Sequence, residues 1–204
     1  MRKTLLRHSI NIASFMFLPI ILMSQNSKSM QVKGRFLYSP NGEKIILKGP
    51  NMMTTWNDRE GNVFAEIAKT GSNVVRIVAE TSDTPKDIEL WINKCLENNM
   101  IPMVENHSAT GKWNEVSGVV NWWTSDEMVK ILKKYDDIFI LNIANECGDG
   151  NVTDQQLKEG YIKYIAQIRS KGLKCPIVVD GMQWAQKPFQ MLNVAEAILN
   201  SDTF

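Results

Sequence analysis

The sequence predicts an α/β fold, a parallel sheet covered by helices. Five apolar, β-branched segments alternate with amphipathic helical segments. The segment that begins at Ile138, Ile-Phe-Ile-Leu-Asn-Ile, is almost wholly apolar, as expected of a strand buried on both faces. No Gly-rich phosphate loop follows any strand, and polar side chains follow several strands instead. This distribution favours a (β/α)8 barrel over a doubly wound sheet, because barrel sites are assembled from several strand ends. We expect the barrel to be truncated after about the fifth βα unit.

The first 29 residues differ in kind from the rest. Arg2, Lys3 and Arg7 make a basic start, residues 10–23 are largely apolar, and residues 24–29 are small and polar. This is the layout of a secretory signal peptide. We therefore expect residues 30–204 to be secreted, into the periplasm or the medium. An uncleaved membrane anchor is the alternative, because no clear small-x-small cleavage site is present.

Charge and cysteine content exclude several classes of partner. Loss of the leader would leave 19 of the 23 Lys and Arg residues against 22 Asp and Glu. No basic patch remains to bind nucleic acid, and no segment remains to span a membrane. Cys95, Cys147 and Cys175 lack the paired spacing of a zinc site, and we expect neither metal nor cofactor. Cys95 is expected to be a buried small hydrophobe, and a disulfide between two of the three stays open.

The chain is expected to start with a β-hairpin over residues 32–49, turning at Ser39-Pro40-Asn41-Gly42. Its second arm leads into a first core strand at residues 49–52. Apolar residues 63, 64, 67 and 68 recur at helical spacing, and Gly71 is placed to end that helix in a left-handed conformation.

The following units are bounded by local signals. Strands are expected at residues 73–79, 101–106 and 176–180, in addition to the strand from Ile138. Thr84 and Thr153 are expected to cap helices, and a capping box from Thr124 to Glu127 is expected to start a helix that ends near Tyr135. A fifth helix is expected over residues 188–200.

Five polar residues are expected at the carboxyl ends of the strands, where barrels carry their chemistry: Glu80, His107, Asn145, Glu146 and Asp180. The pair Asn145-Glu146 is the most informative, because a carboxyl group beside an orienting amide suits proton donation. A solvated Glu after a strand is the alternative for this pair taken alone.

These motifs resemble glycoside hydrolase family five, and within it the bacterial endo-β-1,4-mannanases, from about Gly34 to Asn200. The segment Thr-Gly-Ser-Asn-Val-Val-Arg-Ile-Val at residues 70–78 resembles the second-strand motif of the family. His-Ser-Ala-Thr-Gly from His107 resembles its third-strand motif, and Asn145-Glu146 its fourth-strand pair. Asp-Gly-Met-Gln-Trp-Ala-Gln at residues 180–186 resembles the fifth-strand edge of the mannanases.

The resemblance implies a retaining glycosidase that cleaves a β-1,4-linked polysaccharide, mannan or glucan. Glu146 would be the acid/base, and Asn145 would bind the sugar 2-hydroxyl. Arg76 would keep the attacking carboxylate ionised, and His107 would complete the catalytic set. The implied substrate-binding residues are Trp184, Asp180 and Gln186.

Each assignment has a structural alternative. Arg76 is expected to pair with Glu105 if its role is only structural, and His107 would then be a hydrogen-bonded core residue. The other tryptophans considered are expected to pack rather than to bind sugar: Trp56, Trp113, Trp122 and Trp123.

Two departures from the family pattern bear on function. Cys147 stands where the family usually has Pro or Trp, in the loop that follows Glu146. The nucleophilic Glu is expected beyond Phe204, so we expect these 204 residues alone to be inactive and not stably monomeric. The alternatives are a cellulase of the same family and a non-catalytic, carbohydrate-binding half-barrel.

Overall fold

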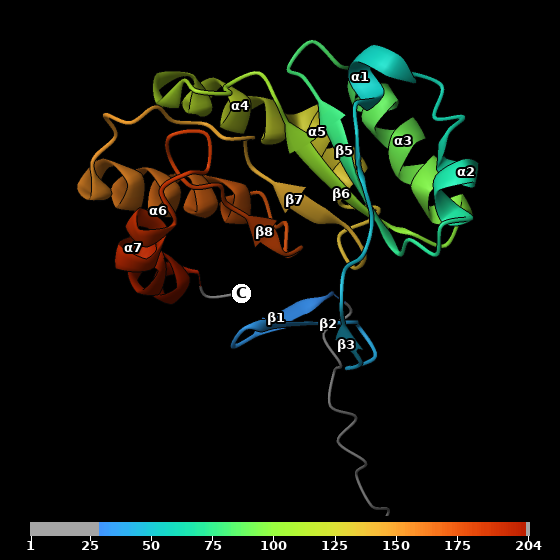
Figure 1. The fold of residues 1–204 in the computed structure, drawn as a ribbon, viewed down its shortest axis with the longest axis horizontal. Helices are drawn as coiled ribbons and strands as arrows, with labels where there is room; N and C mark the ends of the chain where they lie inside the picture. Colours follow the sequence, from blue (N-terminus) through green and yellow to red (C-terminus); the bar gives the residue numbers. More distant parts are fainter. Residues whose placement is uncertain (1–28, 203–204) are drawn as a thin grey trace, which may run out of the picture.

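The structure is a computed structural model that describes residues 29–202, so the predicted leader lies outside the described residues apart from Ser29. Its centre is a parallel sheet in which five strands lie side by side in chain order (Figure 1). These strands are β4 (Asn51–Met52), β5 (Val74–Ala79), β6 (Ile101–Asn106), β7 (Ile140–Asn142) and β8 (Ile177–Val178). The sequential parallel order confirms the predicted βα organisation.

The two faces of this sheet differ in character because successive side chains alternate between them. One face joins the main hydrophobic core through Val75, Ile77, Val104, Leu141 and Ile143. The register places Asn51 beside Arg76 and Glu105 beside Asn142 on the other face. The sheet is therefore apolar toward the helices and carries buried polar residues on its inner side.

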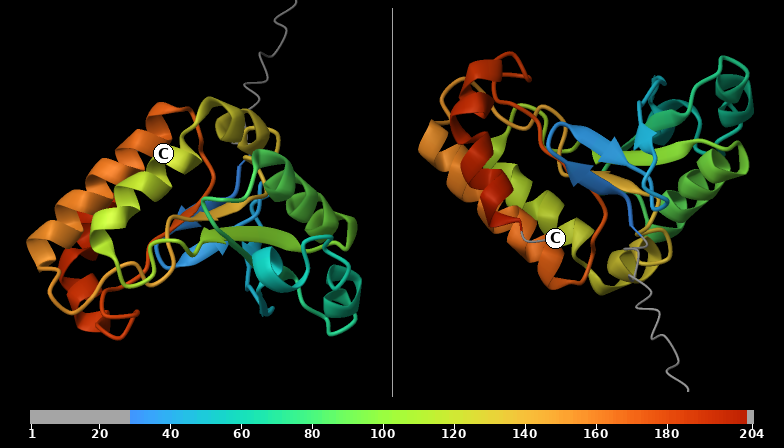
Figure 2. Two further views of the ribbon diagram at one scale, coloured as in Figure 1. Left: turned by 90° about the horizontal axis from the view of Figure 1, so that it is seen from above. Right: turned by 90° about the horizontal axis from the view of Figure 1, so that it is seen from below.

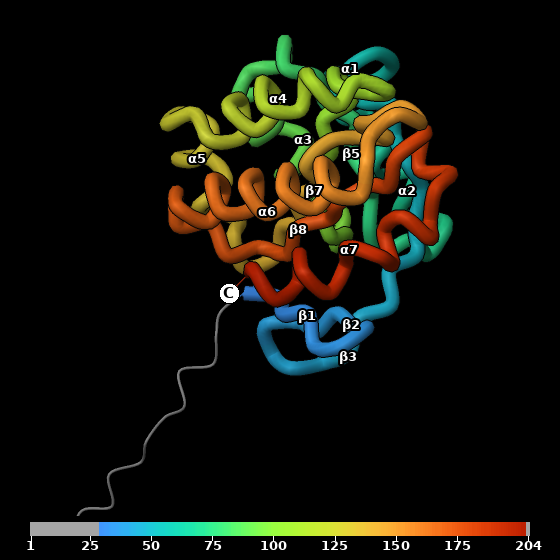
Figure 3. The backbone as a smooth tube through the Cα atoms, turned by 90° about the vertical axis from the view of Figure 1, so that its left-hand side faces the viewer, coloured from blue at the N-terminus to red at the C-terminus, as the bar shows by residue number. Residues whose placement is uncertain are grey.

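The helices cover the outer face as one layer, and from above they surround the strands as an open arc (Figure 2). The layer contains α3 (Pro85–Glu97), α5 (Asp126–Leu132), α4 (Val116–Trp123), α6 (Asp154–Ser170) and α7 (Pro188–Ser201), each packed against the next. Figure 3 shows α4, α6 and α7 one below another on one side of the sheet. Three short helical segments complete the set: α1 (Thr54–Asn57), α2 (Phe64–Ala68) and the 3₁₀ turn Trp113–Glu115.

Two of the expected helix starts are confirmed. The Thr84 side chain accepts a hydrogen bond from the backbone N–H of Asp87, and that of Thr153 accepts one from Gln156. The side chains of Asp87 and Gln156 in turn accept the backbone N–H of the two threonines. Such capping boxes satisfy backbone donors that the helix leaves free. Gly71 has a positive φ of 79°, as its role at a helix end requires.

The expected capping box at Thr124 is wrong. Thr124 ends α4, and its hydroxyl donates to the carbonyl of Val120 at 2.8 Å. Ser125 then precedes α5 without a side-chain capping bond. The segment therefore forms two helices, because the Thr124 hydroxyl lies against the turn behind it rather than over the turn ahead.

The predicted hairpin is present with one strand more than expected. Strands β2 (Phe36–Tyr38) and β3 (Lys44–Ile45) pair on either side of the expected turn, and β1 (Gln31–Lys33) adds a third antiparallel strand. The second arm is shorter than predicted, since it pairs only at two residues.

Cys95, Cys147 and Cys175 are free and buried. Cys95 is fully enclosed among apolar residues, as expected. None of the helices within residues 29–202 combines the length and hydropathy that a bilayer crossing requires.

Candidate active site

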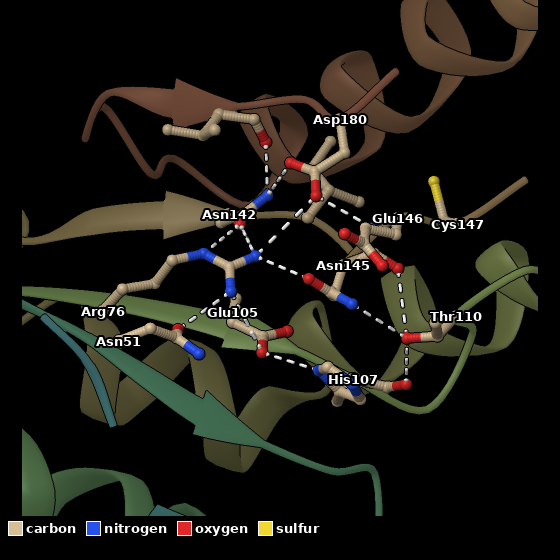
Figure 4. A network of polar contacts seen from close by, with 12 residues as sticks. Asn51, Arg76, Glu105, His107, Thr110, Asn142, Asn145, Glu146, Cys147 and Asp180 are labelled. Carbon is tan, nitrogen blue, oxygen red and sulfur yellow. Dashed lines mark hydrogen bonds and ion pairs between the residues drawn. The ribbon is translucent and has the colours of Figure 1, made fainter. Parts of the chain in front are cut away.

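The carboxyl ends of β4 to β8 bring their polar side chains together in one connected network (Figure 4). This edge is where parallel α/β proteins place functional groups, because the strands hold position while the following loops vary. The network joins residues from five strands or their loops: Asn51, Arg76, Glu105, His107, Thr110, Asn142, Asn145, Glu146 and Asp180.

Arg76 is the centre of the network. Its Nη2 donates to Oδ1 of Asn142 at 2.7 Å and to Oδ1 of Asn145 at 3.0 Å. Its Nη1 donates to Oδ1 of Asn51 at 3.0 Å and lies 3.4 Å from Oε1 of Glu105. The expected pairing with Glu105 is therefore present, but it is one of several contacts. A guanidinium with this many fixed partners holds a single orientation.

Glu105 lies beneath His107 and is fully buried. Its Oε1 is 2.9 Å from Nδ1 of His107, whereas its Oε2 has no hydrogen-bond partner among the described residues. Burial raises the pKa of the Glu105 carboxyl, and its hydrogen bond with His107 acts in the opposite direction. That bond raises the pKa of His107, against the effect of burial. His107 is therefore both hydrogen-bonded inside the fold and partly exposed at the edge.

Asn145 and Glu146 occupy the edge as predicted, with different exposure. Asn145 is buried; its Oδ1 accepts from Arg76, and its Nδ2 donates to the hydroxyl of Thr110 at 3.1 Å. Glu146 is partly exposed, and within residues 29–202 its carboxylate has neither a hydrogen bond nor an ion pair. The amide is thus held by the protein, while the neighbouring carboxyl group is left available to a ligand.

The segment after β8 presents Trp184 beside this edge. Gln183, Trp184 and Ala185 all have φ between 54° and 59°, the left-handed region that residues other than Gly rarely adopt. Trp184 is 48% exposed, and its ring lies over Gly111, where an added Cβ would come within 3.1 Å of the indole nitrogen. Gly111 therefore permits the close approach of a flat apolar surface that solvent can reach. Gln186 is exposed on the same segment.

Asp180 lies inside the network rather than at the solvent. Its Oδ1 accepts from Nδ2 of Asn142 at 3.0 Å, and its Oδ2 accepts from the backbone N–H of Glu146 at 2.8 Å. The same Oδ2 is 3.7 Å from Nη2 of Arg76. Both carboxylate oxygens are therefore used by the protein.

The family model described as Cellulase (glycosyl hydrolase family 5) matches residues 38–201. The chain belongs to glycosyl hydrolase family 5. The resemblance drawn from the sequence motifs is confirmed.

Two relatives that this chain resembles are named mannan endo-1,4-beta-mannosidases. It is 31% identical over 179 residues to a mannan endo-1,4-beta-mannosidase of Salipaludibacillus agaradhaerens, covering 84% of this chain and 57% of that protein. It is 29% identical over 188 residues to one of Cellvibrio japonicus (strain Ueda107), covering 86% of this chain and 43% of that protein. The chain thus spans about half the length of these relatives.

Solved structures confirm the barrel type of fold. The mannohexaose complex of Thermomonospora fusca beta-mannanase matches with a TM-score of 0.80 at 27% identity, over 86% of this chain and 62% of that one. The catalytic domain of a mannanase from Streptomyces sp. SirexAA-E also matches with a TM-score of 0.80, at 23% identity, over 96% of this chain and 63% of that one. The chain therefore corresponds to part of a family 5 barrel.

Several residues at this family 5 site were not expected from the sequence. Asn51, Thr110 and Asn142 join the network directly. The sequence does mark Asn142, because it is the one polar residue in the otherwise apolar segment 138–143. A polar side chain buried in such a strand needs a hydrogen-bond partner. Trp56 was expected to pack rather than to bind sugar. It is 49% exposed, and its ring lies edge-on to that of His107, with 5.2 Å between the ring centroids.

The departure at Cys147 is accommodated by packing. Its Sγ is buried and lies 3.2 Å from the hydroxyl of Tyr161 on α6. Burial raises the pKa of this thiol to about 12, so it remains protonated at neutral pH. Cys147 therefore packs the loop after Glu146 against α6. As a buried, protonated thiol it does not serve as a nucleophile. Within residues 29–202, no group of three or more His, Cys, Asp and Glu side chains is arranged to hold a metal ion.

The Glu105–His107 pair predicts how stability depends on pH. Both pKa values are raised on folding, so between the unfolded and folded values the folded state binds more protons. The resulting stabilisation is complete below the unfolded values, 4.5 for Glu and 6.5 for His, and is lost as pH rises through the folded values. We expect the free energy of unfolding to fall as pH rises above 4.5 through the Glu105 contribution, and to fall further above 6.5 through that of His107, measured by urea denaturation at several pH values.

His107→Gln should flatten this pH dependence. His107 is the only histidine in residues 30–204, so no other histidine of that part of the sequence contributes to the dependence. An equally steep decline in His107→Gln would contradict the assignment to this pair.

Proposed function

We propose that the chain supplies the acid/base side of the active site of a retaining endo-β-1,4-mannanase. The observation that carries the proposal is the unpaired carboxyl group of Glu146, beside an Asn145 amide that Arg76 and Thr110 hold in place. Mannanase relatives on the same barrel support the choice of substrate class. A glycosidic oxygen is a poor leaving group until it is protonated, and Glu146 is positioned to donate that proton.

The other site residues then have distinct roles. Asn145 would hydrogen-bond the sugar 2-hydroxyl, a contact that strengthens as the ring flattens in the transition state. His107 and Arg76 would border the position of the scissile bond. Trp184 would offer its ring to a sugar face, and Gln186 lies next to it on the same segment. Trp56 is a further aromatic surface beside His107.

The second carboxylate of the reaction must come from elsewhere. Retaining enzymes place an attacking carboxylate about 5 to 5.5 Å from the acid. Glu105 is fully buried, and both oxygens of Asp180 are occupied, so neither is free to attack a sugar. We propose that the nucleophile belongs to polypeptide that completes the barrel, since the described sheet has five of the eight strands of this fold.

Two other functions are kept as alternatives. The matching family model bears the name Cellulase, which favours a β-glucan hydrolase as the second candidate. A carbohydrate-binding half-barrel without catalysis is the third, because the network has one unpaired carboxyl group instead of two. We also propose that the protein acts after secretion, on the basis of the leader-like residues 1–29.

The experiment is a comparison of this chain alone with the same chain fused to the C-terminal part of the Salipaludibacillus agaradhaerens mannanase that it does not cover. We expect the fusion to release oligosaccharides from mannan and little from carboxymethylcellulose, and the chain alone to release neither. Preferential cleavage of carboxymethylcellulose would establish the cellulase alternative. Binding of mannan without cleavage by a folded fusion would establish the carbohydrate-binding alternative.

A further inference from the structure

Glu146 has a backbone conformation that its own residue type does not favour. Its φ is 41°, in the left-handed region, where the Cβ of a residue other than Gly meets steric repulsion. Such a conformation persists only where surrounding contacts enforce it, and it is common at functional sites. The direction of the Glu146 side chain therefore depends on whatever holds this backbone.

The contacts to the Glu146 backbone come from two sides. Its carbonyl accepts the backbone N–H of Gly111 at 2.8 Å and that of Gly148 at 3.0 Å. Its own N–H donates to Oδ2 of Asp180 at 2.8 Å. Of these three hydrogen bonds, only the one to Asp180 involves a side chain. Its acceptor is a charged carboxylate, which makes the bond stronger.

Asp180 is itself fixed from three directions. Asn142 donates to its Oδ1 at 3.0 Å, and Arg76 lies 3.7 Å from its Oδ2. The hydroxyl of Tyr161, a fully buried residue of α6, donates to its backbone carbonyl at 2.6 Å. The carboxylate is therefore held by the inner face of the sheet, and the backbone of Asp180 is held by the helix layer.

The following residues reinforce this attachment. Trp184 donates its backbone N–H to the carbonyl of Gly148 at 3.3 Å, and Lys187 donates Nζ to the carbonyl of Gly150 at 2.7 Å. Met182 lies so close to Gly148 that a Cβ there would overlap its sulfur. The segment after β8 thus holds the loop that follows Glu146 along its length.

We propose that Asp180 is a positioning residue that sets the direction of the Glu146 carboxyl group by holding its backbone N–H. The effect on catalysis rests on the proposed role of Glu146 as the acid. The effect of Asp180 on the Glu146 backbone does not depend on that role. Asp180 would act through Glu146 and would not contact the sugar, which replaces the substrate-binding role that the resemblance implied for it.

The test is amide hydrogen exchange on the 204-residue chain, read by NMR at Glu146. In Asp180→Ala, we expect the Glu146 amide to exchange about 10- to 100-fold faster, as loss of a hydrogen bond to a charged group implies, while amides of α3 keep their rates. Asp180→Asn keeps an oxygen acceptor and should restore part of the protection. Unchanged exchange at Glu146, or a uniform increase across the chain, would overturn the proposal.

Asp136→Ala is the matched control. The Asp136 carboxylate also accepts backbone N–H groups, those of Lys174 and Cys175 at 2.8 and 2.9 Å, in the loop before β8. Its removal should speed exchange at those two amides and leave Glu146 unchanged. If Asp180→Ala fails to fold, the same measurement is made on Asp180→Asn. An increase in exchange rate confined to the Glu146 amide would support the proposal, and an unchanged rate would contradict it.

A kinetic comparison separates this inference from the proposed function. In the mannan-cleaving fusion, Asp180→Asn should lower kcat about tenfold or more and leave KM nearly unchanged. A rise in KM alone would show that Asp180 binds substrate instead. If the fusion cleaves no mannan, the exchange result still stands as a test of the positioning contact.

Discussion

Glu146→Gln is expected to lower kcat for mannan by about 10²- to 10⁴-fold in the barrel-completing fusion, the range that a positioned general acid contributes. Gln matches the shape of the carboxyl group but has no proton to give to the departing oxygen. The loss in kcat/KM should be much smaller for an aryl β-mannoside with an acidic phenol, because kcat/KM reports the first step of a retaining reaction and that leaving group departs without protonation. Initial rates on the two substrates measure the difference.

Glu80→Gln is the control for this change, since Glu80 follows β5 at the same edge and has no proposed catalytic role. It should alter kcat by no more than a few-fold. An equal loss of kcat/KM in Glu146→Gln on mannan and on the aryl mannoside would mean that the residue does not act as the acid.

Arg76→Met is expected to cause the largest loss of stability, about 3–5 kcal/mol in the free energy of unfolding. The change leaves the buried Glu105 without its neighbouring cation, and it removes the donor shared by Asn142 and Asn145. Urea denaturation followed by circular dichroism measures the effect. Arg76→Met combined with Glu105→Gln should recover part of the loss, because the unpaired buried charge is then absent.

Lys134→Met tests the same kind of change at the surface. Lys134 pairs with Glu89 at 2.7 Å, and about half of its side chain is exposed. Exposed pairs of this kind contribute little to stability, because water screens them, so the loss should be far smaller than that in Arg76→Met. Equal losses in Arg76→Met and Lys134→Met would show that the buried network adds nothing beyond a surface ion pair.

The position of the site was predictable from the sequence because strand order alone decides which loops meet. Once β6 and β7 are recognised as parallel neighbours, His107 and Glu146 must share one end of the sheet. The contacts among them were less predictable. The role of Asp180 is the clearest example, since its place after β8 is compatible with facing either the solvent or the backbone of Glu146.

Features that arise among residues close together in the chain follow directly from the amino-acid sequence. The alternation of strands and helices, the caps at Thr84 and Thr153 and the left-handed Gly71 all follow from local hydrogen bonds and backbone preferences. The tertiary structure alone decided the partners of the buried polar groups. Arg76 meets residues 66 and 69 positions away, and Asp180 meets an amide 34 positions away. Such pairings depend on how the sheet curves and packs, because burial leaves each polar group only the partners that the fold brings within reach.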